Sequence, residues 1–133
     1  MTHVESREKA LLCVRFALEK KAYDLVVMEV GAFTSLADYF LLCTGRSDTQ
    51  VQAITQSVEE NLGQLGIRPL SVEGYPNGQW VVIDYGDVIV HVFYEPVREF
   101  YDLERLWAQA PRVRLPEPYS SQVRDLRLAN EAR

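Results

Sequence analysis

The sequence has few cysteines and no long hydrophobic run. Its 133 residues include only Cys13 and Cys43, which lie far apart and form no C-x-x-C pattern. A disulfide framework or a zinc site is therefore not expected, and a reducing compartment is the default. No apolar run approaches the roughly 20 residues that cross a bilayer, so we expect no membrane insertion. The length and the hydrophobic content of 47% predict one globular domain.

The sequence also has fewer basic than acidic residues. The chain has 14 Lys and Arg against 19 Asp and Glu, a net charge of -5, and the acidic excess lies before Pro111. Phosphate contacts need clustered positive charge, so direct, sequence-specific nucleic-acid binding is not expected, whereas a basic protein partner fits this charge. The N-terminal residues lack the order of charge, apolar core and small-residue cleavage site of a signal peptide, which predicts a cytoplasmic protein.

Hydrophobic periodicity predicts alternating helices and strands. We expect helices over residues 6–21, 48–65 and 97–107, and strands over 25–30, 39–44, 69–73, 79–84 and 87–94. This order predicts an α/β fold with a mixed β-sheet of about five strands and helices packed on at least one face. If the strands 39–44 and 69–73 are neighbours, the helix between them makes them parallel. Residues 1–110 would form the domain and residues 111–133 a flexible tail, in which 122–132 could form a marginal helix.

Two of the helices carry local patterns. Ser47 and Gln50 fit a capping box, in which the Ser47 hydroxyl accepts from the Gln50 amide and the Gln50 side chain reaches back. Gly66 suits the end of that helix. In the third helix we expect an inner, core-facing stripe made of Val97, Phe100, Leu103, Leu106 and Trp107.

Residues 79–94 predict a β-hairpin with Tyr85 and Gly86 as its loop. This register places Asp84 opposite Asp87 and Trp80 opposite His91. A type I′ turn would force Tyr85 to positive φ, so a bulge or a longer loop that shifts the register by one is an alternative. One face of the hairpin is apolar and suits covering helices. The other mixes aromatic, aliphatic and charged groups: Trp80, Val82, Asp84, Asp87, Ile89, His91 and Phe93.

The mixed face admits several interpretations. Opposed Asp84 and Asp87 would repel by up to about 1 kcal/mol unless a cation, either a metal ion or a partner Lys or Arg, lay between them. A metal is disfavoured because no third carboxylate is near and His91 lies about 13 Å from Asp87 along a strand. Equally, the aspartates could be ordinary turn residues, with His91 paired in the sheet. Trp80 favours a protein-binding anchor with an acidic rim, unless the third helix covers it.

The sequence offers few other candidates for a catalytic or ligand-binding site. The strand-to-helix junction at residues 44–48 could hold a phosphate on backbone amides. It lacks the glycine density and the Lys of a P-loop, so helix capping is the preferred interpretation. Neither Cys13 nor Cys43 has a histidine nearby in sequence, and we expect both to pack as small apolar groups.

Several motifs together resemble a known family, the Iojap proteins or ribosomal silencing factors S. The resemblance rests on five segments in order: DYF at 38–40, CTGRS at 43–47, VEG at 72–74, WVVIDYGDVIVHVF at 80–93 and REFYDLERLW at 98–107. It covers nearly all of the chain from the first helix to Ala110. The tail after Pro111 lies outside the family's common core and is assigned no role.

The resemblance implies a small α/β domain with nucleotidyltransferase-like topology but without catalytic activity, catalytic residues, metal or cofactor. Such a protein would bind large ribosomal subunit protein number fourteen and block association with the small subunit, which lowers translation under nutrient limitation and in stationary phase. From the position of the motifs and the mixed face, we expect the partner contacts to be Trp80, Asp84, Tyr85, Asp87 and His91.

Two alternatives remain at this point. A metal-dependent nucleotidyltransferase-like enzyme would need a Gly-Ser pair before a helix and a closely spaced acidic pair on a later strand. Here the junction reads GRS at 45–47, and two residues separate Asp84 from Asp87, so neither feature matches cleanly. The other alternative is a homodimer that pairs through an exposed sheet face or edge.

Overall fold

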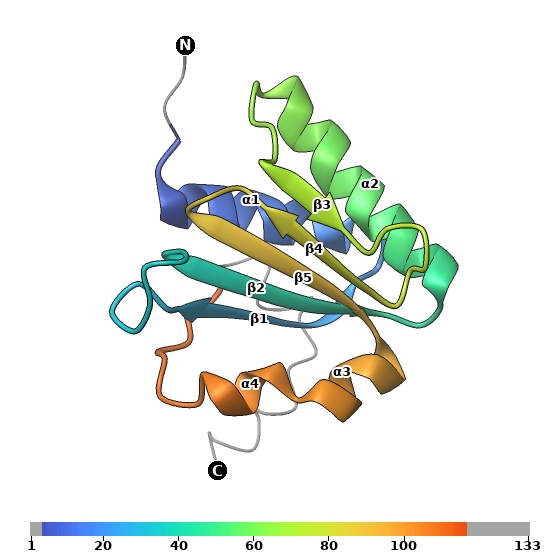
Figure 1. Cartoon of the computed structure of the whole chain (residues 1–133). Coiled ribbons are helices and arrows are strands. Elements are labelled where there is room, and N and C mark those ends of the chain that lie inside the picture. Colours follow the sequence, from blue (N-terminus) through green and yellow to red (C-terminus); the bar gives the residue numbers. More distant parts are fainter. Residues whose placement is uncertain (1–3, 117–133) are drawn as a thin grey trace.

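The computed structural model describes residues 4–116, and its elements follow the predicted alternation (Figure 1). The helices are α1 (Ser6–Leu18), α2 (Asp48–Gln64), α3 (Glu95–Tyr101) and α4 (Leu103–Leu106). The strands are β1 (Tyr23–Glu29), β2 (Tyr39–Gly45), β3 (Ser71–Glu73), β4 (Trp80–Asp84) and β5 (Val88–Tyr94). Within this part of the chain, no helix is long and apolar enough to cross a membrane. The predicted α/β fold with a mixed five-stranded sheet is confirmed.

The strands form one sheet in the order β1-β2-β5-β4-β3. β2 and β5 pair in parallel at its centre, and the other neighbours are antiparallel. The strands considered as parallel neighbours, β2 and β3, lie apart, because β3, β4 and β5 form an antiparallel meander that brings β5 back beside β2. β5 therefore occupies the centre of the sheet, where it is buried at most positions.

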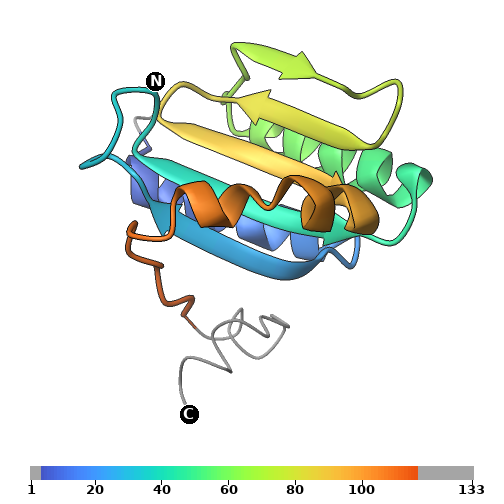
Figure 2. The same ribbon diagram turned by 60° about the horizontal axis from the view of Figure 1, so that its bottom comes forward.

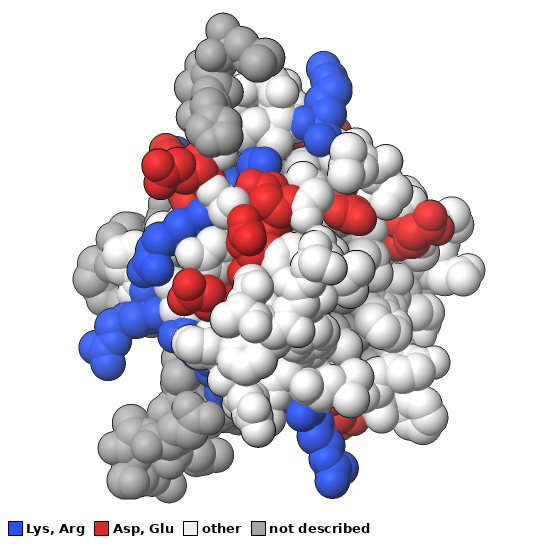
Figure 3. All heavy atoms as spheres, turned by 60° about the vertical axis from the view of Figure 1, so that its left-hand side comes forward, with Lys and Arg blue, Asp and Glu red and all other residues white. Residues whose placement is uncertain are grey.

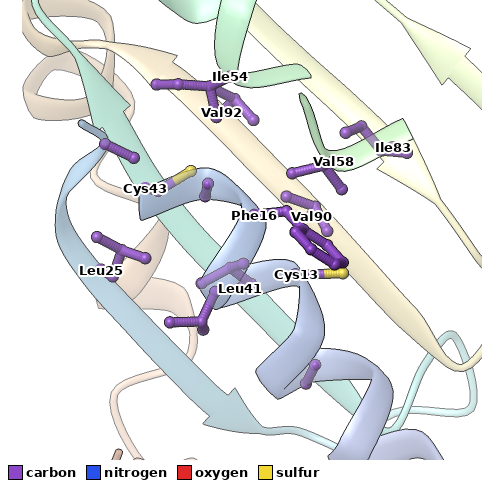
Figure 4. Packing of buried hydrophobic residues seen from close by; sticks show 14 of the residues in the cluster. Cys13, Phe16, Leu25, Leu41, Cys43, Ile54, Val58, Ile83, Val90 and Val92 are labelled. Atoms are coloured by element: carbon purple, nitrogen blue, oxygen red, sulfur yellow. The ribbon is translucent and has the colours of Figure 1, made fainter. Parts of the chain in front are cut away.

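α1 and α2 cover one face of the sheet (Figure 1). Apolar residues recur in both helices at helical spacing, so each turns one stripe toward the strands. Figure 4 shows the resulting core, in which these helices and the strands meet through Cys13, Phe16, Leu41, Ile54, Val58, Val90 and Val92. Cys13 and Cys43 are free thiols in this core, and burial raises the pKa of both. The expectation that they pack as apolar groups is confirmed.

The other face of the sheet is covered over only part of its width. Figure 2 shows α3 and α4 lying across the side formed by β1, β2 and β5, with β4 and β3 left uncovered. Under the two helices lies a second apolar cluster, which contains Val26, Met28, Phe40, Leu42 and Phe93 and is contacted by Val97, Leu103 and Trp107. The uncovered part of this face is the largest departure from a two-sided α/β sandwich.

The hairpin has a different register from the predicted one. Asp84 lies opposite Ile89 and Trp80 lies opposite Phe93, so the predicted pairs of Asp84 with Asp87 and Trp80 with His91 are wrong. The chain turns at Gly86 and Asp87, and the Tyr85 amide donates to the Val88 carbonyl at 2.9 Å. The turn moves by one residue because Gly86 adopts a φ of 90°, which a tyrosine rarely adopts. The cross-strand pairs move by two, so the residues of β4 and β5 keep their predicted faces, whereas Asp87 lies in the turn and is bound by α1.

Two predicted helix boundaries also change. α1 ends at Leu18 because Lys21 adopts a left-handed φ of 63° and the Ala22 amide donates back to the Ala17 carbonyl at 3.2 Å. The predicted third helix is divided into α3 and α4 by Asp102, whose φ is 46°. This break rotates the residues that follow it, with a consequence for Leu106 described below.

The predicted cap of α2 is confirmed. The Ser47 hydroxyl accepts from the Gln50 amide at 3.1 Å, and the Gln50 side chain reaches back to accept from the Arg46 amide at 2.6 Å. The second bond differs from the usual capping box, in which the return bond goes to the cap residue itself. The first turn of α2 is therefore fixed by its own sequence.

The chain after Ala110 continues along the outer edge of β1. The Val113 amide donates to the Val27 carbonyl at 2.8 Å, and the Glu29 amide donates to the Pro111 carbonyl at 2.8 Å. Val113 and Leu115 are buried in the core beneath α1. The folded part thus extends beyond the predicted boundary at residue 110, because two apolar side chains after that boundary find space in the core. The helix considered for 122–132 lies outside the described residues.

A buried ion pair joins α3 and α4 to the sheet. Arg98 and Glu104 are 4% and 3% exposed, and Nη2 of Arg98 lies 3.0 Å from Oε2 of Glu104. Nη1 of Arg98 donates to the Asp24 carbonyl at 2.6 Å and to the Thr44 hydroxyl at 2.7 Å. Because α3 and α4 are each too short to be stable alone, these contacts fix their place on the sheet.

Removal of one partner of this pair is expected to destabilise the fold strongly. Glu104→Leu leaves the Arg98 guanidinium buried without its carboxylate, which costs about 3–5 kcal/mol of unfolding free energy. Urea denaturation followed by circular dichroism measures this loss. Glu99→Leu, on the exposed side of α3, is the matched control and should change the unfolding free energy by less than about 0.5 kcal/mol. Equal midpoints for the Glu104→Leu variant and the unsubstituted chain would contradict the prediction.

Candidate functional site

The uncovered half of the second sheet face forms a mixed polar and apolar surface. Cross-strand partners share a face, so Ser71 lies beside Asp84 and Glu73 lies beside Val82. We call this the open-sheet surface; it consists of Ser71, Glu73, Trp80, Val82, Asp84 and Ile89, all at least partly exposed. It lies on β3, β4 and the start of β5, where α3 and α4 do not cover the sheet, and only Trp80 at its border contacts α3 (Figure 2).

Trp80 marks the border between the open and the covered half of the face. Its indole stacks on Phe93, with ring centroids 5.0 Å apart, and contacts the Tyr101 ring of α3 at 5.1 Å. Its Nε1 donates to Nδ1 of His91 at 3.2 Å. Trp80 is half-buried, so one part of its ring is fixed by neighbours while another part meets solvent. A Trp held in this way is typical of anchors in protein interfaces.

His91 supports Trp80 from below and is itself only 7% exposed. Because Nδ1 accepts from Trp80, the ring proton of neutral His91 belongs on Nε2, which has no hydrogen-bond partner among the described residues. The His91 ring contacts Phe40 edge-on at 5.2 Å. Burial lowers the pKa of His91 to about 4. The structure therefore brings Trp80 and His91 together, but exposes only the tryptophan.

The two aspartates of the hairpin make separate contacts. Asp84 lies on the open-sheet surface, and its Oδ1 accepts from the Gly86 amide at 2.7 Å. Asp87 is held by α1: Nζ of Lys9 lies 2.8 Å from its Oδ1, and the Ser6 hydroxyl lies 2.9 Å from its Oδ2. Burial raises the pKa of Asp87, but the bonds from Lys9 and Ser6 outweigh it, so the net pKa is lowered. Asp84 and Asp87 are not opposed, so no cation is needed between them, and Asp87 is paired with Lys9 of the same chain.

Tyr85 lies on the opposite face from the other predicted contact residues. It is 6% exposed and packs in the cluster beneath α1 and α2. Burial raises the pKa of its hydroxyl, which has no hydrogen-bond partner among the described residues. Tyr85 therefore stabilises the base of the hairpin and is not accessible from the open-sheet surface.

Carboxylates also gather on the side of the molecule that carries the start of α1 and the hairpin tip (Figure 3). The Ser6 hydroxyl lies within hydrogen-bond distance of both Asp87 and Asp38, 2.8 Å from the latter, and donates to one of them at a time. A shallow polar pocket next to Asp38 is lined by Glu5 and Glu29 as well. Within residues 4–116, no three His, Cys, Asp or Glu side chains meet in an arrangement that could hold a metal ion.

The junction before α2 is closed by contacts within the chain. The amides of Arg46, Thr49 and Gln50 donate to protein side-chain oxygens, which leaves these three donors engaged. Gly78 packs so closely on Asp48 that an added Cβ would lie 2.7 Å from its carbonyl oxygen. The capping interpretation of residues 44–48 agrees with these contacts, whereas a bound phosphate would have to displace them.

The sequence interpretation missed an exposed apolar feature on α3 and α4. Phe100 and Leu106, predicted to face the core, are 80% and 77% exposed, and Tyr101 is 56% exposed. The other three residues of the predicted stripe, Val97, Leu103 and Trp107, do face the core. The prediction assumed one continuous helix, and the left-handed Asp102 breaks its phase. Nothing in the residue types of 97–107 predicts that break.

Comparison with known proteins identifies relatives over most of the chain. The family model described as "Ribosomal silencing factor during starvation" matches residues 3–133. The ribosomal silencing factor RsfS of Bacillus subtilis is 40% identical over 106 residues, which cover 78% of this chain and 90% of that protein. A crystal structure of a Chromobacterium violaceum protein is similar with a TM-score of 0.78 at 35% identity, covering 88% of this chain and all of that one. A Bacillus halodurans structure gives 0.73 at 39% identity, with 80% and 97% covered.

Protonation of His91 is expected to weaken the fold at acid pH. In the unfolded chain His91 binds a proton near pH 6.5, whereas folded His91 stays neutral until about pH 4, so its contribution to stability is constant above pH 6.5 and falls between these values. The full difference is about 3 kcal/mol of unfolding free energy. Urea denaturation at pH 7 and pH 4.5 measures it, and His91→Gln should lose less stability across this interval.

The matched control for this titration is His3→Gln, which removes the chain's other histidine. This variant should retain the pH dependence of the unsubstituted protein. If His91→Gln and the unsubstituted chain lose stability in parallel, the titrating group is a carboxylate and the role given to His91 is wrong.

Proposed function

The chain belongs to the family of ribosomal silencing factors, and on that premise we propose that it binds the large ribosomal subunit through protein number fourteen and blocks its association with the small subunit. The effect would be to lower translation during nutrient limitation, in keeping with the starvation role in the description of the family. The observation that carries the proposal at the level of the structure is the open-sheet surface, an uncovered sheet face with an anchored Trp80 and acidic neighbours.

The chemistry of this surface suits a basic protein. Glu73 and Asp84 lie on adjacent strands of the open half, and Trp80 lies at its inner border. The net charge of -5 favours approach to a positively charged patch and disfavours contact with bare RNA phosphates. An aromatic anchor with carboxylates at its rim is the arrangement expected for such a partner.

The five residues expected to make contact take different roles in this proposal. Trp80 and Asp84 touch the partner, and Asp87, which is partly exposed beside Lys9, adds negative charge at the rim. His91 acts indirectly, because it is buried and holds the Trp80 indole through its Nδ1. Tyr85 is buried on the far face and supports the turn that presents Asp84.

The proposed action is steric and needs no chemical step. A folded body of this size bound on the joining face of the large subunit would occupy space that the small subunit requires. No substrate, cofactor or metal enters this scheme. The proposal requires only that the bound state persist long enough to compete with subunit joining.

Binding to the large subunit is the direct test. The unsubstituted chain should co-sediment with purified large subunits and reduce the formation of joined ribosomes in a sucrose gradient. Trp80→Ala combined with Asp84→Lys should weaken binding by about 2 kcal/mol or more, a loss of roughly thirtyfold, because it removes the anchor and reverses a rim charge. The binding constant is measured by titration of labelled chain with subunits.

The matched control is Leu65→Ala with Glu60→Lys at the C-terminal end of α2, which truncates an exposed apolar side chain and makes the same charge change outside the open-sheet surface. It should bind as the unsubstituted chain does. Absence of co-sedimentation by the unsubstituted chain would overturn the proposed function. Equal weakening in the control would instead assign the effect to net charge alone.

A further inference from the structure

Three large apolar side chains of α3 and α4 are exposed to solvent. Phe100, Tyr101 and Leu106 are 80%, 56% and 77% exposed, and they fall within one short stretch of chain. We call them the helix surface. Beneath it, Arg98 is bound to Glu104 and holds both helices on the sheet. A group of large exposed apolar side chains on a fixed backbone is typical of a surface that is covered in at least one state of the protein.

The path of the chain after α4 leads back toward α3. Residues 111–113 are bonded to the outer edge of β1, with Arg112 opposite Met28 in an antiparallel bridge. The residues that follow therefore run toward the start of β1. There, Arg98 of α3 donates to the Asp24 carbonyl at 2.6 Å. The described chain thus ends on the side of the sheet edge where α3 begins to cross it (Figure 2).

The remaining residues, 117–133, lie outside the described part of the chain, and their length is sufficient to reach the helix surface. The described residues end at Pro116. Residues 117–123 span up to about 23 Å when extended. This distance is about twice the diameter of a helix with its side chains, so a segment that begins at Val123 can lie across α3 and α4.

The composition of this segment matches the helix surface. Residues 123–128 read VRDLRL, with three large apolar residues and a net charge of +1 from two Arg and one Asp. Around the helix surface, exposed or partly exposed carboxylates outnumber the exposed Arg105; they belong to Glu95, Glu99 and Asp102. Apolar side chains can therefore meet apolar ones while Arg124 and Arg127 approach carboxylates.

Other exposed apolar groups are less suitable for this segment. Residues 123–128 are too few to form a stable element alone, so their apolar side chains leave water only by packing on the folded domain. The remaining large exposed apolar side chains lie in the β1–β2 loop, at the far end of β1, or between the end of α2 and β3: Phe33, Leu36, Leu65 and Leu70. The helix surface is the described apolar group on the side to which the chain leads.

We propose that residues 123–128 dock on the helix surface in the free protein and act as an autoinhibitory segment. The consequence for binding rests on the proposed function. The Tyr101 and Trp80 rings are 5.1 Å apart, so a segment docked on Tyr101 borders the open-sheet surface and obstructs a partner there. Because only the undocked fraction of molecules binds, docking raises the apparent Kd by the inverse of that fraction.

A spin label in the full chain tests the docking itself. Asn130→Cys supplies the attachment point for a thiol-reactive nitroxide, and the natural Cys13 and Cys43 are buried in the core. The nitroxide should broaden the amide NMR signals of α3 and α4. Signals of the β1–β2 loop around Leu36, at the far end of β1, should keep their intensity.

Substitutions on either side of the contact should remove this broadening. Val123→Ser with Leu126→Ser removes apolar side chains from the segment, and Phe100→Ser with Leu106→Ser removes them from the helix surface. Both ridge-side residues are exposed, so the urea midpoint of that variant should match the midpoint of the unsubstituted chain.

The matched control is Ala129→Ser with Ala132→Ser, which makes the neighbouring part of residues 117–133 more polar but leaves residues 123–128 intact. The broadening should persist in this variant. In titrations with purified large subunits, Val123→Ser with Leu126→Ser should bind about fivefold more tightly than the unsubstituted chain, as expected if roughly 80% of free molecules are docked. The control should bind as the unsubstituted chain does.

The outcomes separate this inference from the proposed function. If α3 and α4 are not broadened, or if Val123→Ser with Leu126→Ser leaves subunit binding unchanged, the inference is overturned and the proposed function stands. If the broadening is seen but the unsubstituted chain does not co-sediment with large subunits, the proposed function and the autoinhibitory role are overturned. Broadening between nitroxide-labelled chains and isotope-labelled chains without nitroxide would assign the contact to a second copy and overturn the inference.

Discussion

The Arg98 guanidinium binds at once to a carboxylate at the start of α4, a backbone carbonyl in β1 and a hydroxyl on β2. Two of these contacts lie at or next to irregular backbone. Asp24 has a φ of 49° where the register of β1 shifts, and Asp102 has a φ of 46° between the two helices. One buried side chain therefore links the irregular part of β1 to the short helix that follows Asp102. This contact holds the helical cover on the second sheet face.

Where the cover stops decides what the second face can do. Phe40, Leu42 and Phe93 lie beneath α3 and α4 as ordinary core. One strand further along, the same face presents Val82 and Asp84 to solvent. Trp80 lies at the boundary between the covered and the uncovered part of the face. Its ring packs on Phe93, and its indole nitrogen donates to His91. The site is thus an extension of the core into solvent, which explains how an aromatic anchor can be rigid without a dedicated loop to hold it.

The features set by local sequence were predictable, and those set by distant contacts were not. The α2 cap at Ser47 and the division of the hairpin into two faces follow from neighbouring residues, and both are present. The predicted register of the hairpin is wrong because Gly86, rather than Tyr85, occupies the first turn position. That position has a positive φ, which glycine adopts readily. The ion pair of Asp87 with Lys9 was not predicted, because Lys9 is far away in sequence. The exposure of Leu106 depends on the break at Asp102, and the burial of His91 depends on how far α3 and α4 extend over the sheet, which periodicity does not predict.

The two outer edges of the sheet are protected from further strand pairing in different ways. Beside β1, residues 111–113 satisfy backbone groups through the bonds to Val27 and Glu29. β3 is the outermost strand at the other edge, only three residues long, with Glu73 at its end. A short, charged edge is a poor template for another strand, which protects the protein from open-ended polymerisation. The molecule can therefore leave part of one sheet face uncovered without offering its backbone for uncontrolled assembly.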